Sequence, residues 1–182
     1  MVVKNESLMD ISALSDWFTE TSNVKDMSGL FSSDYKLTDI SALKNWSVDN
    51  VTNLSKTFEN TGITSVEALS SWNTKNVTNL NRAFRAVDDL RSLSGIEAWD
   101  VSNVKIFSQT FCRDPRLTDV SAINDWNILS GTDFTHMFWL EQKDGHSTQN
   151  EKVHGTTMAR LHLNKKCANG SANRQTHFLW FL

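Results

Sequence analysis

The stretch Val51-Thr52-Asn53-Leu54-Ser55-Lys56-Thr57-Phe58 recurs in near copies between residues 24 and 138. A tryptophan stands ahead of each copy, five residues before the valine position in all but the first copy. The copies follow one another every 26 or 27 residues, apart from two extra residues between Trp17 and Val24. Self-similarity at a fixed period of this length is the signature of a repeat protein.

Each repeat has seven positions that are apolar throughout, with Gly131 as the one exception. Three of them precede the tryptophan at every third residue, as in Leu37, Ile40 and Leu43. We expect these positions to form a core shared between stacked repeats, with the tryptophans and phenylalanines in two aromatic ladders. The core residues predicted in this way include Trp17, Phe31, Trp46, Val51, Leu54, Phe58, Trp72, Phe84, Trp99, Phe111, Trp126 and Phe138.

The spacing of Val51, Leu54 and Phe58 places the three side chains on one face of a short helix. Asn50 precedes this segment and is a suitable first residue for a helix, because its side chain can accept a bond from a free backbone N–H group. The earlier part of the repeat, residues 37–46, fits a very short strand that runs into a tight turn. The predicted fold class is therefore an α/β repeat solenoid of about five coils, each a short parallel strand plus a short helix.

Residues 37–58, and above all the Trp-Asp-Val-Ser-Asn-Val run at 99–104, resemble the repeat of the BspA-like leucine-rich-repeat surface proteins. The resemblance covers residues 8 to 138. It implies a leucine-rich-repeat-like solenoid on a bacterial or protist cell surface that takes part in adhesion to host proteins or to other cells. It carries no enzymatic residues and no cofactor. The expected localisation is accordingly the cell surface or the extracellular space.

Composition limits the function classes further. The formal net charge is −3, without the basic stripe that is typical of nucleic-acid binding, so we expect no nucleic-acid partner. No stretch is long and apolar enough to span a membrane, and the first residues lack the apolar core of a signal peptide. The two cysteines, Cys112 and Cys167, lie far apart in the sequence, one in a repeat and one in the tail, so they do not define a disulfide framework. Cys112 is expected to be a buried thiol.

Residues 139–182 depart from the repeat and form the second predicted unit, after the five repeats of residues 1–138. This tail carries a net charge of +3, against −6 for the repeats. It is interpreted either as a cap on the last coil or as a poorly ordered or foreign tail, such as the truncated end of a longer reading frame. His154, Met158 and His162 would share one face of a helix, but they are too few to predict a metal site.

No catalytic motif is present, so the chain is predicted not to be an enzyme and to need neither a cofactor nor a metal. Asp10, Asp39 and Asp119 share one repeat position and would stack on an outer face, where Ser65 and Ser92 interrupt the row. Such a row could bind cations, although a solvated face is the simpler interpretation. His136 has no partner that would make it a general base.

Two functions fit this pattern. The first is a protein-protein interaction or adhesion module whose specificity lies in the residues between the core positions, and the candidate exposed face holds Arg82, Arg85 and Arg91. The second is a structural spacer, a fragment of a longer surface solenoid with no ligand of its own. Binding of the purified chain to a host protein would distinguish them.

Overall fold

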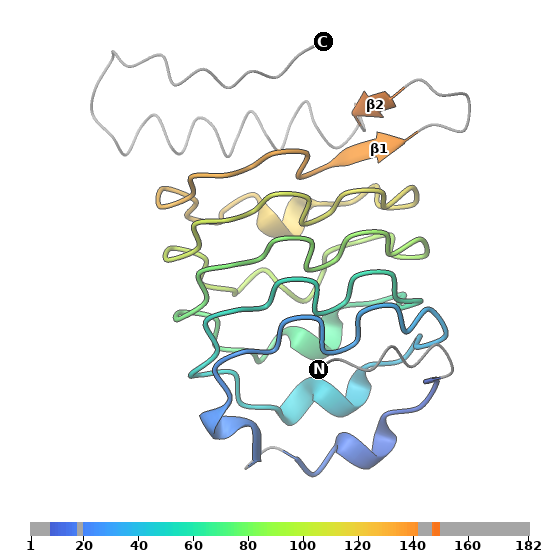
Figure 1. Cartoon of the computed structure of the whole chain (residues 1–182), viewed down its shortest axis with the longest axis vertical. Coiled ribbons are helices and arrows are strands. Elements are labelled where there is room, and N and C mark those ends of the chain that lie inside the picture. The colour runs from blue at the N-terminus through green and yellow to red at the C-terminus, as the bar shows by residue number, and fades with distance from the viewer. Residues whose placement is uncertain (1–7, 18–19, 142–146, 150–182) are drawn as a thin grey trace.

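The computed structural model describes residues 8–17, 20–141 and 147–149. The repeats form a stack of coils, so that equivalent residues of successive repeats lie above one another (Figure 1). Parallel bridges join one column of residues through the whole stack, in the order Asp26, Asn53, Asn79, Ile106 and Asp133. The stacking of repeats is therefore as the sequence period indicates.

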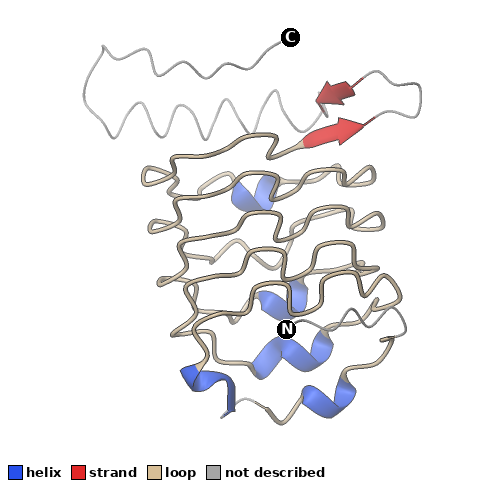
Figure 2. Cartoon of the chain, in the orientation of Figure 1, coloured by secondary structure: helices blue, strands red, loops and turns tan. Residues whose placement is uncertain are grey.

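Regular secondary structure is sparse in the described residues (Figure 2). It comprises five 3₁₀ helices and two strands. These are η1 (Ser12–Leu14), η2 (Glu20–Asn23), η3 (Ser41–Asn45), η4 (Glu67–Leu69), η5 (Ser121–Ile123), β1 (Trp139–Glu141) and β2 (Ser147–Gln149). The predicted α/β repeat solenoid is therefore wrong: no α-helix occurs in this part of the chain, and the coils pair through isolated bridges rather than through a sheet of strands.

The segment from Val51 to Phe58 consists of consecutive turns instead of a helix. Backbone bonds within it run only three residues back, from Thr57 N–H to the Leu54 carbonyl and from Glu59 N–H to the Lys56 carbonyl. Lys56 and Asn60 have positive φ angles of 60° and 57°. A left-handed residue interrupts an α-helix, and the same two positions are left-handed in the neighbouring repeats, as Gly29 and Ser33 in the first and Arg82 and Ala86 in the third.

This backbone geometry turns alternate N–H groups toward the next coil. Leu54, Lys56, Phe58 and Asn60 donate to carbonyls of the following repeat over distances of 2.9 to 3.0 Å. The same four bonds recur between the other coils of the stack. The i, i+3, i+7 spacing that favoured a helix is thus the spacing of a turn segment whose hydrogen bonds run between coils.

Asn50 does not start a helix. Its side-chain amide donates to the Ser22 carbonyl of the preceding coil at 2.7 Å, and Asn76 and Asn103 make the same contact one and two coils further on. The asparagine column is therefore a set of cross-coil donors.

The core follows the predicted positions closely. Phe31, Phe58, Phe84, Phe111 and Phe138 stack with ring centroids 5.4 to 5.7 Å apart. Trp72, Trp99 and Trp126 stack almost in parallel, which confirms the two aromatic ladders. Of the twelve core residues named from the sequence, all except Trp17 are buried.

The tryptophan ladder also has a polar function. The indole N–H of Trp46 donates to the Leu14 carbonyl of the coil before it, and Trp72, Trp99 and Trp126 donate in the same way. Trp17 belongs to the first described coil, has no such acceptor among the described residues and is 51% exposed. Its prediction as a core residue is wrong, because no described coil packs on the outer side of coil one.

Two glycines explain local departures from the repeat. A Cβ atom at Gly131 would lie 2.3 Å from the Phe134 ring, so this ring fills the space that Val51 and its counterparts occupy in other coils. Gly95 has a φ of 112°, and a Cβ there would lie 2.5 Å from the Cα of Glu67. The backbones of coils three and four therefore approach closely at Gly95, and coil four has no 3₁₀ helix there.

The last described segment is the antiparallel pair of β1 and β2, in which Leu140 faces Thr148. The β1 strand continues directly from the fifth repeat and lies at the C-terminal end of the stack (Figure 1). Residues 150–182, with the predicted tail or cap and the His154, Met158 and His162 pattern, lie outside the described residues.

Candidate interaction surface

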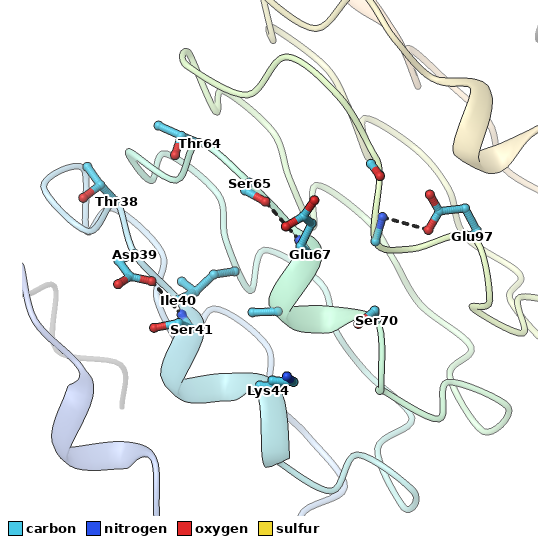
Figure 3. A pocket seen from close by; sticks show the side chains of 13 residues that line it. Thr38, Asp39, Ile40, Ser41, Lys44, Thr64, Ser65, Glu67, Ser70 and Glu97 are labelled. Carbon is cyan, nitrogen blue, oxygen red and sulfur yellow. Dashed lines mark hydrogen bonds between the residues drawn. The ribbon is translucent and has the colours of Figure 1, made fainter.

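A groove of about 780 Å³ crosses coils two to four, the repeats that contain Trp46, Trp72 and Trp99. It lies on the side of the stack that carries η3 and η4. Its polar lining comes from three successive repeats, with Thr38 and Asp39 in the first, Thr64 and Ser65 in the second, and Ser94 in the third (Figure 3). Most of these side chains bear hydroxyl groups. The charged residues that line it are Asp39, Lys44, Glu67 and Glu97.

The groove lies where the backbones of neighbouring coils are not hydrogen-bonded to each other. On the opposite side of the repeat, backbone bonds join every pair of described coils. On the groove side, the described residues show such bonds only between coils four and five, where Ser92 and Asp119 form a parallel bridge. Within the groove, residues 38–41 and 64–67 are therefore held in place by side chains and by their own turns, whereas residues 91–94 also form backbone bonds to coil five.

Side-chain caps hold those turns. Asp39 accepts the Ser41 N–H at 2.8 Å, and Ser65 accepts the Glu67 N–H at 3.2 Å through its hydroxyl group. Asp10, Ser92 and Asp119 cap the corresponding N–H groups of their own coils. Both aspartate and serine occur in this row because either side chain can accept the bond.

The aspartate row is thus a set of turn caps. The hydrogen bonds that Asp10 and Asp119 accept from the backbone N–H groups of Ser12 and Ser121 lower the pKa of both carboxyl groups. Among the described residues, no three His, Cys, Asp or Glu side chains come together in a way that could hold a metal ion. The row therefore gives no support to a cation site.

Two charged side chains of the groove remain available for a ligand. Glu97 is already used, because its carboxylate accepts the Gly95 N–H at 2.7 Å, and bonds from its own and the Gly95 backbone lower its pKa. Lys44 and Glu67 are exposed, and neither side chain makes a hydrogen bond or an ion pair within the described part of the chain. They come from adjacent coils and point an opposite pair of charges at the groove.

The three arginines named from the sequence lie on two parts of the repeat. Arg82 and Arg85 belong to the turn segment, which comprises residues 51–60 and their counterparts in the other coils, and both are half-buried. Arg85 pairs with Glu59 at 3.0 Å. Arg91 is exposed and directly precedes Ser92, one of the aspartate and serine residues that cap the turns beside the groove. Sequence reasoning missed Lys44 and Glu67. The signal nearest to them was the row of aspartate and serine residues that contains Asp39 and Ser65.

The remaining candidate groups do not form a second site. His136 is exposed, and its ring meets Trp139 edge-on at a centroid distance of 5.6 Å. Cys112 is buried, as expected, and burial raises the pKa of its thiol. Within the described residues, no helix is both long and apolar enough to cross a membrane.

The stacked coils and the polar groove define a repeat protein with a groove across one side of its coils. The chain belongs to the family described as "Mycoplasma protein of unknown function, DUF285", whose model matches residues 1–85 and again residues 54–171. Two overlapping matches are what an internally repeated chain produces. No curated protein and no solved structure matches the chain.

Proposed function

We propose that this protein is a non-enzymatic interaction module of the BspA-like leucine-rich-repeat type, which binds a protein partner at a cell surface. The observation that supports this proposal is the groove across coils two to four, where side chains of three repeats converge on one polar surface. Repeat stacks commonly bind partners on such extended surfaces, because neighbouring repeats present equivalent positions side by side.

The groove presents exposed residues beside a buried core. Positions 38, 39, 64 and 65 are exposed, whereas Ile40 and Val66 beside them are buried. Substitution of the exposed residues therefore leaves the core unchanged. This separation of binding residues from packing residues is what an adhesion module requires.

The test is a binding assay of the purified chain against immobilised host matrix proteins. The double variant Lys44→Ala/Glu67→Ala removes the two charged groups that the fold does not use, and it should reduce affinity at least tenfold. The matched control is Lys25→Ala/Lys105→Ala, two exposed lysines at equivalent positions of the turn segment. This control should bind as the parent does.

The second candidate is a structural spacer within a longer surface solenoid. The continuous backbone ladder on one side of the stack favours it, because such a ladder suits a stiff element. A spacer predicts no binding by the parent to any matrix protein. Equal loss of binding in the groove variant and in the control would contradict the assignment to the groove.

A further inference from the structure

Arg82 is a half-buried cation that the fold leaves without a partner. Its side chain makes no hydrogen bond or ion pair within the described residues, and its Nε atom is buried. Buried polar atoms in folded proteins nearly always have a hydrogen-bond partner, and an unpaired charge is especially costly. The guanidinium group of Arg82 is therefore available to an anionic ligand.

Lys56 and Arg85 lie beside Arg82 on the turn segment. The Lys56 N–H donates to the Asn81 carbonyl at 2.9 Å, which places Lys56 next to Arg82 in the adjoining coil. The Arg85 N–H donates to the Arg82 carbonyl at 3.2 Å, so one tight turn contains both arginines. We call Lys56, Arg82 and Arg85 the basic cluster.

One carboxylate among the described residues pairs with the basic cluster. Glu59 accepts a bond from Arg85 Nη1 at 3.0 Å, which leaves the cluster a formal charge of +2. The same repeat positions in coils one and four hold uncharged residues, which are Gly29, Ser32, Gln109 and Cys112. The excess positive charge therefore stands out within repeats whose total is −6.

Asp114 does not remove this excess. Burial raises the pKa of its carboxyl group well above the ordinary value, which favours the neutral form, and the nearby charge of Arg85 opposes that rise only weakly. The Oδ2 atom of Asp114 has no hydrogen-bond partner, so no arginine of the basic cluster is bonded to it.

The charge and shape of the basic cluster select the ligand. Arginine presents its N–H donors in a fork that fits two oxygens of one anion, and lysine adds a single compact charge. A carboxylate carries one negative charge and would leave part of the excess uncompensated. A phosphate monoester carries about 1.5 to 2 negative charges near pH 7 and has three acceptor oxygens, so it fits both the charge and the donors.

We propose that the basic cluster is a binding site for a dianionic phosphate group. The Arg82 guanidinium and the Lys56 ammonium donate to the phosphate oxygens, and the ion pair with Glu59 holds Arg85 beside them. The site belongs to the turn segment, whereas the groove lies on the opposite side of the coils. The phosphate site is therefore independent of the proposed adhesion function.

Isothermal titration calorimetry of the whole chain tests the site with O-phosphoserine and inorganic phosphate as probes, at a constant ionic strength set with sodium chloride. Both probes should give saturable binding, and serine should give none. Arg82→Gln should weaken binding about tenfold or more, because it removes charged hydrogen-bond donors. Lys56→Gln, at an exposed position, should weaken it less. Tighter binding of phosphoserine would identify an esterified phosphate as the ligand, and tighter binding of inorganic phosphate the free ion; either result supports the site.

Two further variants make the result specific. Arg91→Gln removes an exposed arginine outside the basic cluster and should bind as the parent does. Glu59→Gln should strengthen binding, because it removes the carboxylate that offsets the cluster. Absence of saturable binding of both probes, or an equal loss in Arg91→Gln, would overturn the proposal. Thermal melts check that each variant is folded, and Lys56→Gln decides the test if Arg82→Gln is not.

Discussion

The two sides of each coil are held together in different ways. The turn segment, residues 51–60 and their counterparts, forms backbone bonds to both neighbouring coils and contains the phenylalanine ladder. The cap segment, residues 38–46 and their counterparts, depends on indole donors, aspartate or serine caps and a close backbone approach at Gly95. A side held by backbone bonds leaves little room for variation, whereas a side held by side chains can open into a groove.

The largest effect is expected from the phenylalanine ladder of the turn segment. Phe58 is 1% exposed and stacks between Phe31 and Phe84. Phe58→Ala should lower the free energy of unfolding by roughly 3 to 5 kcal/mol, as is usual for such a core truncation. Urea melts check this against Tyr35→Ala, which removes an exposed aromatic ring and should cost less than about 0.5 kcal/mol. Equal midpoints for the two variants would contradict the stacked core.

The indole donors of the cap segment should give the next largest effect. Trp99→Phe keeps an aromatic ring but removes the indole donor to the buried Leu69 carbonyl, which still accepts the Trp72 backbone N–H. The lost hydrogen bond should cost about 0.5 to 1.5 kcal/mol, in addition to the packing lost with the smaller ring. Trp17→Phe is the matched control, because Trp17 is exposed and has no such acceptor in the described coils. Thermal melts should show a clear loss for the first variant and almost none for the second.

A smaller, pH-dependent effect is expected at Asp114, which follows the turn segment of coil four. Asp114 is 1% exposed, and burial raises the pKa of its carboxyl group well above the ordinary value, although that group accepts the Val87 N–H at 2.8 Å. A raised folded-state pKa stabilises the protein at low pH, and this stabilisation is lost as the pH rises through the folded value. Asp114→Asn keeps the acceptor, so it should be more stable than the parent at pH 8.

The advantage of Asp114→Asn should disappear as the pH falls below about 4, the ordinary range of a carboxyl group. Asp100→Asn is the control with the opposite sign. Hydrogen bonds from Ser102 lower the pKa of Asp100, so its charged form stabilises the fold above the ordinary carboxyl range. Urea midpoints measured from pH 3.5 to pH 8 would separate the two. A pH-independent gain for Asp114→Asn would show that charge burial is not its cause.

The smallest effect concerns the left-handed positions of the turn segment. Ala86 has a φ of 57° and donates its N–H to the Cys112 carbonyl. Ala86→Gly removes the left-handed penalty of about 1 to 2 kcal/mol. Part of this gain is offset by the greater freedom of glycine in the unfolded chain, about 0.4 to 1 kcal/mol. The net stabilisation should therefore be about 1 kcal/mol or less.

Ala98→Gly is the matched control, because Ala98 is exposed and does not have a positive φ. It should destabilise the protein by about 0.4 to 1 kcal/mol through the unfolded state alone. Differential scanning calorimetry should thus show shifts of opposite sign for the two alanines. Shifts of the same sign would mean that the left-handed geometry carries no cost in this fold.

The sequence predicted the period, the core positions and the two ladders because apolar side chains at a fixed spacing report directly on packing. It failed on secondary structure because an apolar residue every third or fourth position is equally the pattern of successive tight turns. The left-handed geometry had only weak local signals, since Lys56 and Arg82 occupy the column of Gly29 and Ala86 occupies that of Asn60. The groove could not be predicted, because it depends on which coils lack cross-coil backbone bonds.

The cross-coil contacts of the tryptophan ladder join residues about one repeat apart, as Trp99 with Leu69 and Trp126 with Ile96. A chain pulled by its two ends would therefore lose one coil at a time, since the described coils form backbone bonds only to adjacent coils. With repeats of 26 or 27 residues, every released coil would lengthen the tether by roughly 90 Å. Under load the stack would act as an extensible linker that yields in equal steps.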